Sequence, residues 1–516
     1  MNVHISPKHR LIGVPVREDL SNLFPAAKRV TMNGNNMMLV KYGLDETRLL
    51  RNMGFEVPAP IASFYDWEGG TPFDIQIKTA AMLTTQQRAY VLNGMGTGKT
   101  KASLWSWRFL NKSGDAGKLI VVAPLSTLNF TWAREVFQTL PGVRTAVLHG
   151  SKAKRLKMLA DPEIDAYIIN HDGLAVIEDE LTKRTDIDTL ILDELATYRN
   201  GTSQRTKIAR RIAARMKWVW GMTGSPTPNA PTDAWSQCSI VTPNTVPKYF
   251  NRFRDDVMYR LTQFKWAPKQ GALDHVFDVM QPAVRFTLDD VVELPELVER
   301  TVDVELGPKQ EKVYKQMEEH AYTAISNKEI TAMNAGAVLN KLLQISTGYV
   351  YTREGDIVSL DNEKRLIALV DAVDATSEKV IVFVPFVHAL DAVRKRLVTE
   401  GYDVRQVSGA TPKSERDQIF NLFQNTDAVK VIVAHPQCMS HGLTLTAATT
   451  IIWFAPLPNL EVFEQANARI RRVGQKHKQQ ILMFQSTKAE RQMYAKLRAK
   501  QKVQNMLLEM FADATH

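Results

Sequence analysis

The feature that most constrains this chain is a glycine-rich stretch, Asn93-Gly94-Met95-Gly96-Thr97-Gly98-Lys99-Thr100. Three residues typical of a strand, Tyr90-Val91-Leu92, come before it, and a predicted helix over 101–110 follows it. Strand, glycine loop and helix in this order form a phosphate-binding loop, because glycine backbone N–H groups and the helix dipole attract an anion. The alternative is a glycine turn that happens to precede a helix. We interpret the stretch as a nucleoside triphosphate site.

Each residue type in this loop has a chemical role. The Lys99 ammonium can reach the β- and γ-phosphates, and the Thr100 hydroxyl can ligate Mg²⁺. The candidate residues for binding the nucleotide are Gly94, Met95, Gly96, Thr97, Gly98, Lys99 and Thr100.

Bulk properties exclude several classes of protein. At 516 residues, with 44% hydrophobic and 23% charged residues, the chain has an ordinary globular composition and is too long for one core. Cys238 and Cys438 belong to no metal-binding motif, so neither a disulfide framework nor a structural zinc is expected. Residues 1–10 lack the apolar segment of a signal peptide, and the longest apolar run, 380–387, is too short for a bilayer. We expect a cytoplasmic protein without a membrane segment.

The net charge of +10 is concentrated near the C-terminus. Residues 465–516 carry 11 Lys/Arg and 3 Asp/Glu. Such a basic segment indicates a polyanionic partner or, alternatively, the solvated face of a helix.

Residues 71–235 alternate apolar runs with helical stretches, which predicts a parallel α/β sheet buried on both faces. The predicted strands are 89–92, 119–123, 166–170, 189–192 and 218–222. Residues 1–70 read as a small accessory domain, whose charges nearly balance at 8 Lys/Arg and 7 Asp/Glu. Residues 236–300 read as a helical insertion or hinge. Their aromatic and basic residues indicate either nucleic-acid binding or helix packing with solvated charges.

Two carboxylates, Asp193 and Glu194, follow the predicted strand 189–192. Ligand-binding residues lie at the carboxyl ends of parallel strands, and we expect this strand beside that of the glycine loop. Asp193 can then hold Mg²⁺, and Glu194 can orient or deprotonate the attacking water. An acidic pair that caps a helix is the alternative. Thr223 to Pro228, after the last predicted strand, could sense the γ-phosphate or form a plain proline-rich loop.

A second α/β pattern begins near Val302. A helical stretch over 309–344 precedes predicted strands at 380–384, 404–407, 431–434, 450–454 and 481–484. Only the first sheet has a phosphate loop, so we expect two lobes with nucleotide between them. Arg469 and Arg472, three residues apart on a predicted helix, could stabilise transition-state charge from the second lobe. Alone, such arginines are usually surface features.

Taken together, the strings in residues 71–510 resemble superfamily 2 helicases, and within them the Swi/Snf-like double-stranded-DNA translocases of compact bacterial and phage type. The matching strings are Thr71 to Gln76 (Q-motif), Asn93 to Thr100 (phosphate loop), Ala123 to Leu128 with Trp132 and Glu135 (Ia), Ile169 to Leu174 (Ib), Asp193 to Asn200 (II), Thr223 to Pro226 (III), Val382 to Val384 (IV), His441 to Leu445 (V) and Gln465 to Gln475 (VI). Ala196 stands where the family usually has His or Gln, and Thr444 where Asn is commoner.

The resemblance implies a fold, cofactors and site residues. It implies two tandem RecA-like lobes, over 71–235 and 301–516, and a C-terminal brace helix over 488–511. ATP and Mg²⁺ would be the cofactors, with Gln76 reading adenine and Thr100 and Asp193 holding the metal. Lys99, Asp193, Glu194, Arg469 and Arg472 would be catalytic, and Gln465 would contact the γ-phosphate.

The implied function is an ATP-dependent translocase, expected to be monomeric, that moves on duplex DNA and remodels forks and junctions. Motifs Ia, Ib, IV and V would hold the DNA backbone without sequence preference. The alternatives are an RNA helicase, a translocase that displaces proteins such as RNA polymerase, and a non-hydrolysing DNA-binding scaffold. A preference for branched DNA rests on analogy with small phage and annealing-helicase relatives.

Overall fold

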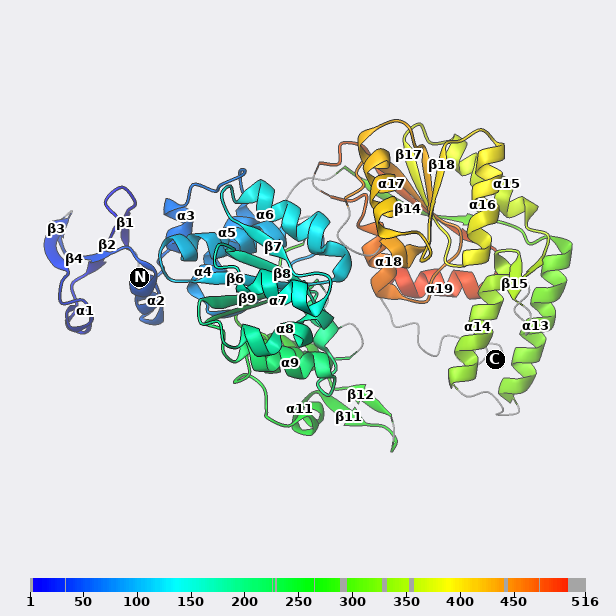
Figure 1. The fold of residues 1–516 in the computed structure, drawn as a ribbon. Coiled ribbons are helices and arrows are strands. Elements are labelled where there is room, and N and C mark those ends of the chain that lie inside the picture. The colour runs from blue at the N-terminus through cyan, green and yellow to red at the C-terminus, as the bar shows by residue number, and fades with distance from the viewer. Residues whose placement is uncertain are drawn as a thin grey trace. The chain divides into compact units, whose positions relative to one another are not determined.

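The computed structural model divides the chain into two compact units, residues 1–291 and 292–516 (Figure 1). The structure describes residues 3–32, 34–224, 226–227, 230–263, 265–287, 295–326, 332–351, 357–439, 444–472 and 474–499. No helix in these ranges combines the length and the apolar character that crossing a bilayer requires.

The first unit begins with a small antiparallel sheet that has its own core. The strands run in the order β1 (His4–Ser6), β2 (Leu11–Pro15), β4 (Asn35–Lys41) and β3 (Lys28–Met32). Helices α1 (Glu18–Leu23) and α2 (Leu44–Asn52) complete it. Ile12 and Val14 of β2 and Met38 and Val40 of β4 alternate into the core, where they meet Leu50 of α2.

A parallel sheet forms the centre of the first unit. Its strand order is β13 (Ala283–Val284), β5 (Arg88–Val91), β10 (Trp218–Met222), β9 (Ile187–Asp193), β6 (Lys118–Ala123), β8 (Ala166–Asn170) and β7 (Thr145–Val147). All five predicted strands are present, and the short β7 and β13 were not predicted. One expectation is wrong: β9, which carries Asp193, does not lie beside β5, because β10 pairs with both.

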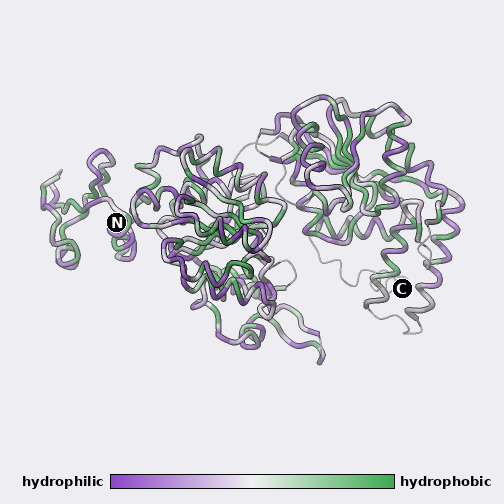
Figure 2. The backbone as a smooth tube through the Cα atoms, viewed as in Figure 1, coloured by the Kyte–Doolittle hydropathy of each residue, from purple (hydrophilic) through white to green (hydrophobic). Residues whose placement is uncertain are grey.

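Helices cover both faces of this sheet because neighbouring residues of each strand point to opposite sides. Ala89 and Val91 belong to the same hydrophobic cluster as Leu104 of α5, whereas Tyr90 belongs to the cluster that contains Ile177 of α8. Figure 2 shows the resulting hydrophobic strands inside a more hydrophilic periphery. The helices are α3 (Pro60–Phe64), α4 (Asp74–Thr85), α5 (Lys99–Lys112), η1 (Leu125–Thr127), η2 (Leu128–Ala133), α6 (Arg134–Thr139), α7 (Lys152–Ala160), η3 (His171–Gly173), α8 (Leu174–Leu181), η4 (Leu195–Tyr198), α9 (Gln204–Ala213) and α10 (Asp233–Val241).

The segment predicted as a helical insertion is only partly helical. It contains α11 (Phe250–Val257) and α12 (Ala272–Val279), with an antiparallel hairpin, β11 (Met258–Arg260) and β12 (Trp266–Pro268), between them. Its last described strand, β13, pairs in parallel with β5 and so belongs to the first sheet.

The second unit holds a second parallel sheet, in the order β14 (Leu297–Asp303), β21 (Gln479–Gln485), β20 (Ala448–Trp453), β17 (Lys379–Phe383), β19 (Val431–Ala434) and β18 (Val404–Val407). All predicted strands are present. The added strand β14 has mostly exposed polar residues and lies at the sheet edge, so it lacks the apolar run of a central strand. The prediction of two parallel-sheet α/β lobes is thus confirmed.

The helices of this unit include the predicted long helical stretch as α13 (Pro308–Ser326) and α14 (Ala332–Ser346). A small antiparallel ladder, β15 (Tyr349–Tyr351) and β16 (Ile357–Ser359), follows α14. The remaining helices are α15 (Glu363–Asp374), α16 (Val387–Thr399), α17 (Lys413–Asn425), η6 (Pro436–Met439), α18 (Leu460–Asn467) and α19 (Lys488–Arg498). Helix α19 is the described part of the predicted brace helix, and residues 500–516 lie outside the described ranges.

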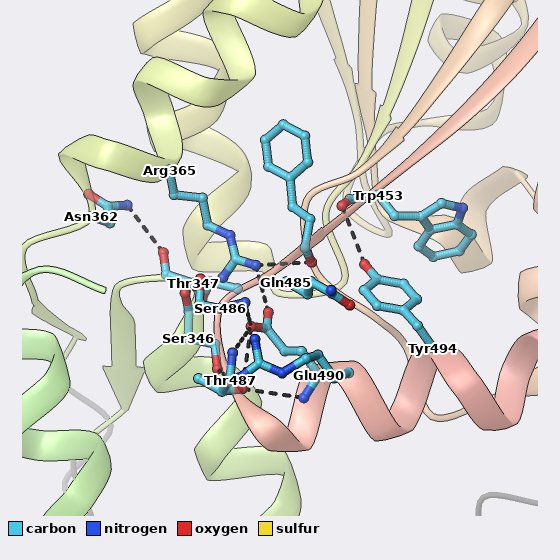
Figure 3. A network of polar contacts seen from close by, with 12 residues as sticks. Ser346, Thr347, Asn362, Arg365, Trp453, Gln485, Ser486, Thr487, Glu490 and Tyr494 are labelled. Carbon is cyan, nitrogen blue, oxygen red and sulfur yellow. Dashed lines mark hydrogen bonds and ion pairs between the residues drawn. The ribbon is translucent and has the colours of Figure 1, made fainter. Parts of the chain in front are cut away.

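A buried ion pair joins α15 to α19 (Figure 3). Arg365 Nη2 lies 2.7 Å from Glu490 Oε1, with side-chain exposures of 2% and 0%. The same guanidinium donates to the backbone carbonyls of Ser346 and Phe484. Glu490 Oε2 accepts hydrogen bonds from the backbone of Ser486 and Thr487. The pair therefore ties the ends of α14 and β21 to two helices.

Candidate nucleotide site

The glycine-rich loop connects β5 to α5, and its backbone requires glycine. Gly96 and Gly98 have φ values of 79° and 77°, in the left-handed region that side chains disfavour. A Cβ at Gly98 would also lie 2.0 Å from Gln76 Nε2. Any side chain at residue 98 would thus displace Gln76. The loop therefore makes the tight glycine turn of a phosphate-binding loop, and α5 begins directly after it at Lys99.

The Lys99 ammonium is held over this loop. Lys99 Nζ donates to Asn93 O at 2.7 Å and to Gly94 O at 3.2 Å. The Thr97 hydroxyl closes the same turn by donating to Gly94 O at 2.9 Å. Thr100 lies half-buried in the first turn of α5, next to Lys99. The cation and the hydroxyl that the sequence predicted for phosphate and Mg²⁺ therefore lie together at the start of α5.

Asn93, which replaces the first glycine of the strict Walker pattern, anchors the loop. Its Oδ1 accepts from Phe286 N at 3.0 Å, and its Nδ2 donates to Thr79 Oγ1 at 3.1 Å. Gly94 N in turn donates to Phe286 O at 2.7 Å. This corrects one expectation: the Gly94 N–H is bonded to the chain after β13 and does not point to an anion. Met95, between Gly94 and Gly96, is half-buried.

Asp193 ends β9 as a half-buried carboxylate with defined partners. Trp132 Nε1 donates to Asp193 Oδ2 at 2.9 Å, and Glu194 N donates to Oδ1 at 3.0 Å. Burial raises the pKa of the Asp193 carboxyl, while the Trp132 hydrogen bond, the Lys99 charge and the Glu194 N–H oppose that rise. Lys99 is thus close enough to act on Asp193 electrostatically. Glu194 has a φ of 51°, an unfavourable backbone conformation that is typical of functional sites.

The end of β10 brings motif III to the same place. Thr223 N donates to Val91 O at 3.1 Å, which aligns the ends of β10 and β5. A Cβ placed on Gly224 would lie 4.0 Å from Lys99 Nζ, so the backbone after Thr223 passes close to that ammonium. Ser225 and Pro228 lie outside the described residues. Residues from β5, β9 and β10 therefore meet at one edge of the sheet, as parallel strands require.

Gln76 lies against the loop from α4. Its side chain is 4% exposed, and Oε1 accepts from Phe73 N at 2.9 Å, which fixes the start of the helix. The amide nitrogen faces Gly98. The structure therefore brings together Gln76, Lys99, Thr100 and Asp193, four of the residues predicted for this site.

Sequence reasoning missed the roles of two aromatic residues here. Trp132 lies on η2, a π-helix, which is an element frequent at functional sites. The buried Tyr198 hydroxyl shares a 2.9 Å hydrogen bond with His171 Nδ1, linking motif II to motif Ib next to Ala196. Both aromatics were visible within motif strings, but no spacing rule indicates their partners.

The predicted arginines of the second unit, Arg469 and Arg472, follow α18, which ends at Asn467, so the expectation that they lie on a helix is wrong. Gln465 is 6% exposed and donates to Glu461 Oε1 at 3.2 Å, and Arg469 is 2% exposed. Arg472 Nη1 donates to Thr444 Oγ1 at 3.1 Å, which connects motif VI to motif V. Burial lowers the pKa of Arg472 to about 10, so its guanidinium keeps its charge at neutral pH. His441 to Leu443 and Val473 lie outside the described residues.

The glycine loop, its lysine and the strand-end carboxylate define a phosphate-loop nucleoside triphosphatase built on two parallel sheets. Family comparison makes the class specific. Residues 76–348 match the SNF2-related domain, and residues 362–474 match the helicase conserved C-terminal domain. The chain belongs to the SNF2-related family and is an ATPase of helicase superfamily 2.

Individual relatives are distant. Protein p41 of Acyrthosiphon pisum secondary endosymbiont phage 1 is 26% identical over 402 residues, 74% of this chain and 85% of p41. The ISWI chromatin-remodeling complex ATPase ISW1 of Saccharomyces cerevisiae is 22% identical over 414 residues, 76% of this chain but only 36% of ISW1. An ATP-dependent helicase of Mycoplasma pneumoniae is 21% identical over 481 residues, 88% of this chain and 45% of its own length.

The Sulfolobus solfataricus SWI2/SNF2 ATPase core, solved in complex with dsDNA, aligns with a TM-score of 0.41 and 22% identity, covering 84% of this chain and 92% of the archaeal one.

Proposed function

We propose that this ATPase is stimulated by DNA, translocates on duplex DNA and remodels branched structures such as forks and junctions. The observation that supports it most is the meeting of Lys99, Asp193 and the Gly224 backbone at one sheet edge, in a chain of the SNF2-related family. In such motors, a cation that binds the phosphates, a carboxylate that binds the metal ion and motif III together couple hydrolysis to movement.

Mg²⁺ fits the donor set at this edge. The Thr100 hydroxyl and the Asp193 carboxylate are hard oxygen ligands, and Asp193 is held in place by Trp132. When bound, Mg²⁺ neutralises charge on the phosphates. In our proposal Lys99 binds the phosphates, Glu194 orients the attacking water, and Gln76 hydrogen-bonds adenine.

From the second unit, we propose that Gln465, Arg469 and Arg472 act on the γ-phosphate. Arg472 retains its charge at neutral pH, which a transition-state-stabilising guanidinium needs. Its hydrogen bond to Thr444 would link this role to motif V, which holds DNA backbone in related motors.

We propose that residues 1–70 form an accessory domain for DNA substrates, that 71–235 and 301–516 form the two motor lobes, and that 236–300 form an insertion.

The charges of residues 1–70 nearly balance in total, but the basic and acidic residues lie in different segments of the fold. Residues 3–17 and 24–41, which contain the strands and the turns that join them, have six basic and no acidic residues: Lys8, Arg10, Arg17, Lys28, Arg29 and Lys41. Arg17 forms an ion pair with Asp19 of α1, which leaves five basic residues. The strand register places Lys28 and Lys41 on one face of the sheet, with Lys41 opposite Leu11 at the end of the β1–β2 turn. This favours a polyanion as the partner of the sheet.

The proposal is tested by measuring ATP turnover and strand displacement with plain duplex, forked DNA, four-way DNA and RNA. The full chain is compared with a chain that begins at Pro58. We expect duplex DNA to stimulate turnover many-fold, RNA to leave it unchanged, and removal of the N-terminal sheet to reduce activity on branched DNA selectively. Turnover that ignores DNA would overturn the proposal.

A further inference from the structure

The β11–β12 hairpin has one packed face and one open face. Register pairs Met258 with Pro268 and Tyr259 with Ala267. Met258 is 8% exposed and belongs to a hydrophobic core of the first unit, and the partly buried Trp266 packs against the same core. Because strand residues alternate, Tyr259 points to the opposite face, where it is 48% exposed. Leu261, two residues on and 51% exposed, continues that face.

A lysine completes the open face. Leu261 N donates to Lys265 O at 2.8 Å, so Lys265 lies across the hairpin from Leu261. We call Tyr259, Leu261 and Lys265 the hairpin face. Lys265 is exposed, and no carboxylate of the described residues pairs with it. An aromatic ring, an aliphatic side chain and a cation therefore share one surface.

The charge around the hairpin face is positive. Residues 248–269 contain six Lys/Arg and two Asp/Glu, a net charge of +4. Several of these cations serve the local fold: Arg254 lies 3.9 Å from the Trp266 ring centroid, Arg260 donates to the loop carbonyls of Thr262 and Gln263, and Lys269 donates to Asp255 O. They nevertheless contribute to the local positive potential.

A second exposed apolar pair in the same segment has the opposite surroundings. Leu273 and Phe277 are one helical turn apart on α12 and are 65% and 55% exposed. Asp274 and Asp278 follow each of them directly, so carboxylates border this pair. Exposed apolar area is thus similar at the two places, and the sign of the neighbouring charge differs.

We propose that the hairpin face binds unpaired bases at a DNA strand junction. In this arrangement the Tyr259 ring stacks on a base, Leu261 fills the step beside it, and Lys265 contacts a phosphate. Unpaired nucleotides offer π-faces and negative charge together, which matches the hairpin face; an apolar protein surface would use only Tyr259 and Leu261. The inference rests on the proposed function and adds a contact that distinguishes branched from plain DNA.

The test compares two double variants of the full chain, Tyr259→Ala/Leu261→Ala and Leu273→Ala/Phe277→Ala. Binding is measured without ATP to plain duplex and to a fork that carries 2-aminopurine at its first unpaired position. We expect the hairpin variant to bind the fork about tenfold more weakly, as loss of one stacked base predicts, and plain duplex as before. The 2-aminopurine signal of the wild type should disappear. The α12 variant should match the wild type, and Tyr259→Phe should keep fork binding because the ring remains.

Three outcomes would overturn the inference: an unchanged fork affinity, an equal loss on plain duplex, or an equal loss in the α12 variant. The third outcome would indicate a general response to removing surface apolar groups. Because binding is measured without hydrolysis, the result does not depend on whether DNA stimulates ATP turnover, so the proposed function can fail separately.

Discussion

Replacing Glu490 by glutamine tests the buried ion pair of the second unit. The glutamine Oε1 can still accept from the backbone of Ser486 and Thr487, so the change chiefly removes the negative charge. Arg365 then stays 2% exposed without its counter-ion. Breaking such a buried pair costs about 3–5 kcal/mol of unfolding free energy. Glu363→Gln on α15 is the matched control, because the Glu363–Arg396 pair has exposures of 58% and 22% and such surface pairs contribute roughly 0–1 kcal/mol.

Hydrogen exchange read by mass spectrometry suits this measurement, since a chain with two units need not unfold in a single transition. Peptides from α15 and α19 report the opening free energy of the second unit, and peptides from β5 to α5 serve as an internal reference in the first. We expect Glu490→Gln to lower protection in α15 and α19 together, and Glu363→Gln to leave it nearly unchanged. Equal, small effects of the two variants would refute the assignment of the pair as a stabilising link.

Three further predictions concern the nucleotide site. Lys99→Ala should abolish ATP hydrolysis while leaving DNA binding measurable, and unchanged turnover would move the active site elsewhere. Gly98→Ala should weaken nucleotide binding at least tenfold, measured with a fluorescent ATP analogue, because its Cβ would collide with Gln76; normal affinity would contradict the loop geometry. Trp132→Phe should raise the Mg²⁺ concentration for half-maximal turnover about tenfold, whereas Trp105→Phe, which loses a similar indole hydrogen bond to Glu68 O, should not; equal shifts would exclude a specific role for Trp132.

The sequence predicted the central strands because each is an apolar run bounded by polar residues, a pattern that burial on both faces imposes. It failed at the sheet edges. Strand β13 has only two residues, and β14 carries charged residues because an edge strand is partly exposed. The strand order was also not readable, since pairing depends on contacts distant in sequence. The expectation that β9 lies beside β5 failed for that reason.

The site residues likewise divide into those that a local sequence pattern predicts and those that depend on contacts distant in sequence. Lys99, Thr100 and Asp193 could be named because their chemistry depends on a short motif or on a strand end. The Trp132 hydrogen bond to Asp193 joins residues 61 positions apart, and no local pattern encodes it. The charge count of residues 1–70 likewise concealed that most of the basic residues lie in the strands and turns of the sheet segments and that the acidic residues lie elsewhere. Composition gives a sum, whereas the fold decides where each charge lies.

The two hydrogen bonds between Phe286 and the glycine loop have a mechanical consequence. Gly94 N donates to the carbonyl of Phe286, and Asn93 Oδ1 accepts from the N–H of Phe286. Phe286 comes directly after β13 and precedes the second unit in the sequence. A phosphate that draws Lys99 away from the carbonyls of Asn93 and Gly94 would disturb the same two residues that hold this strand. Nucleotide binding would therefore act on the chain after β13 in two ways, through the main-chain N–H of Gly94 and through the side-chain amide of Asn93.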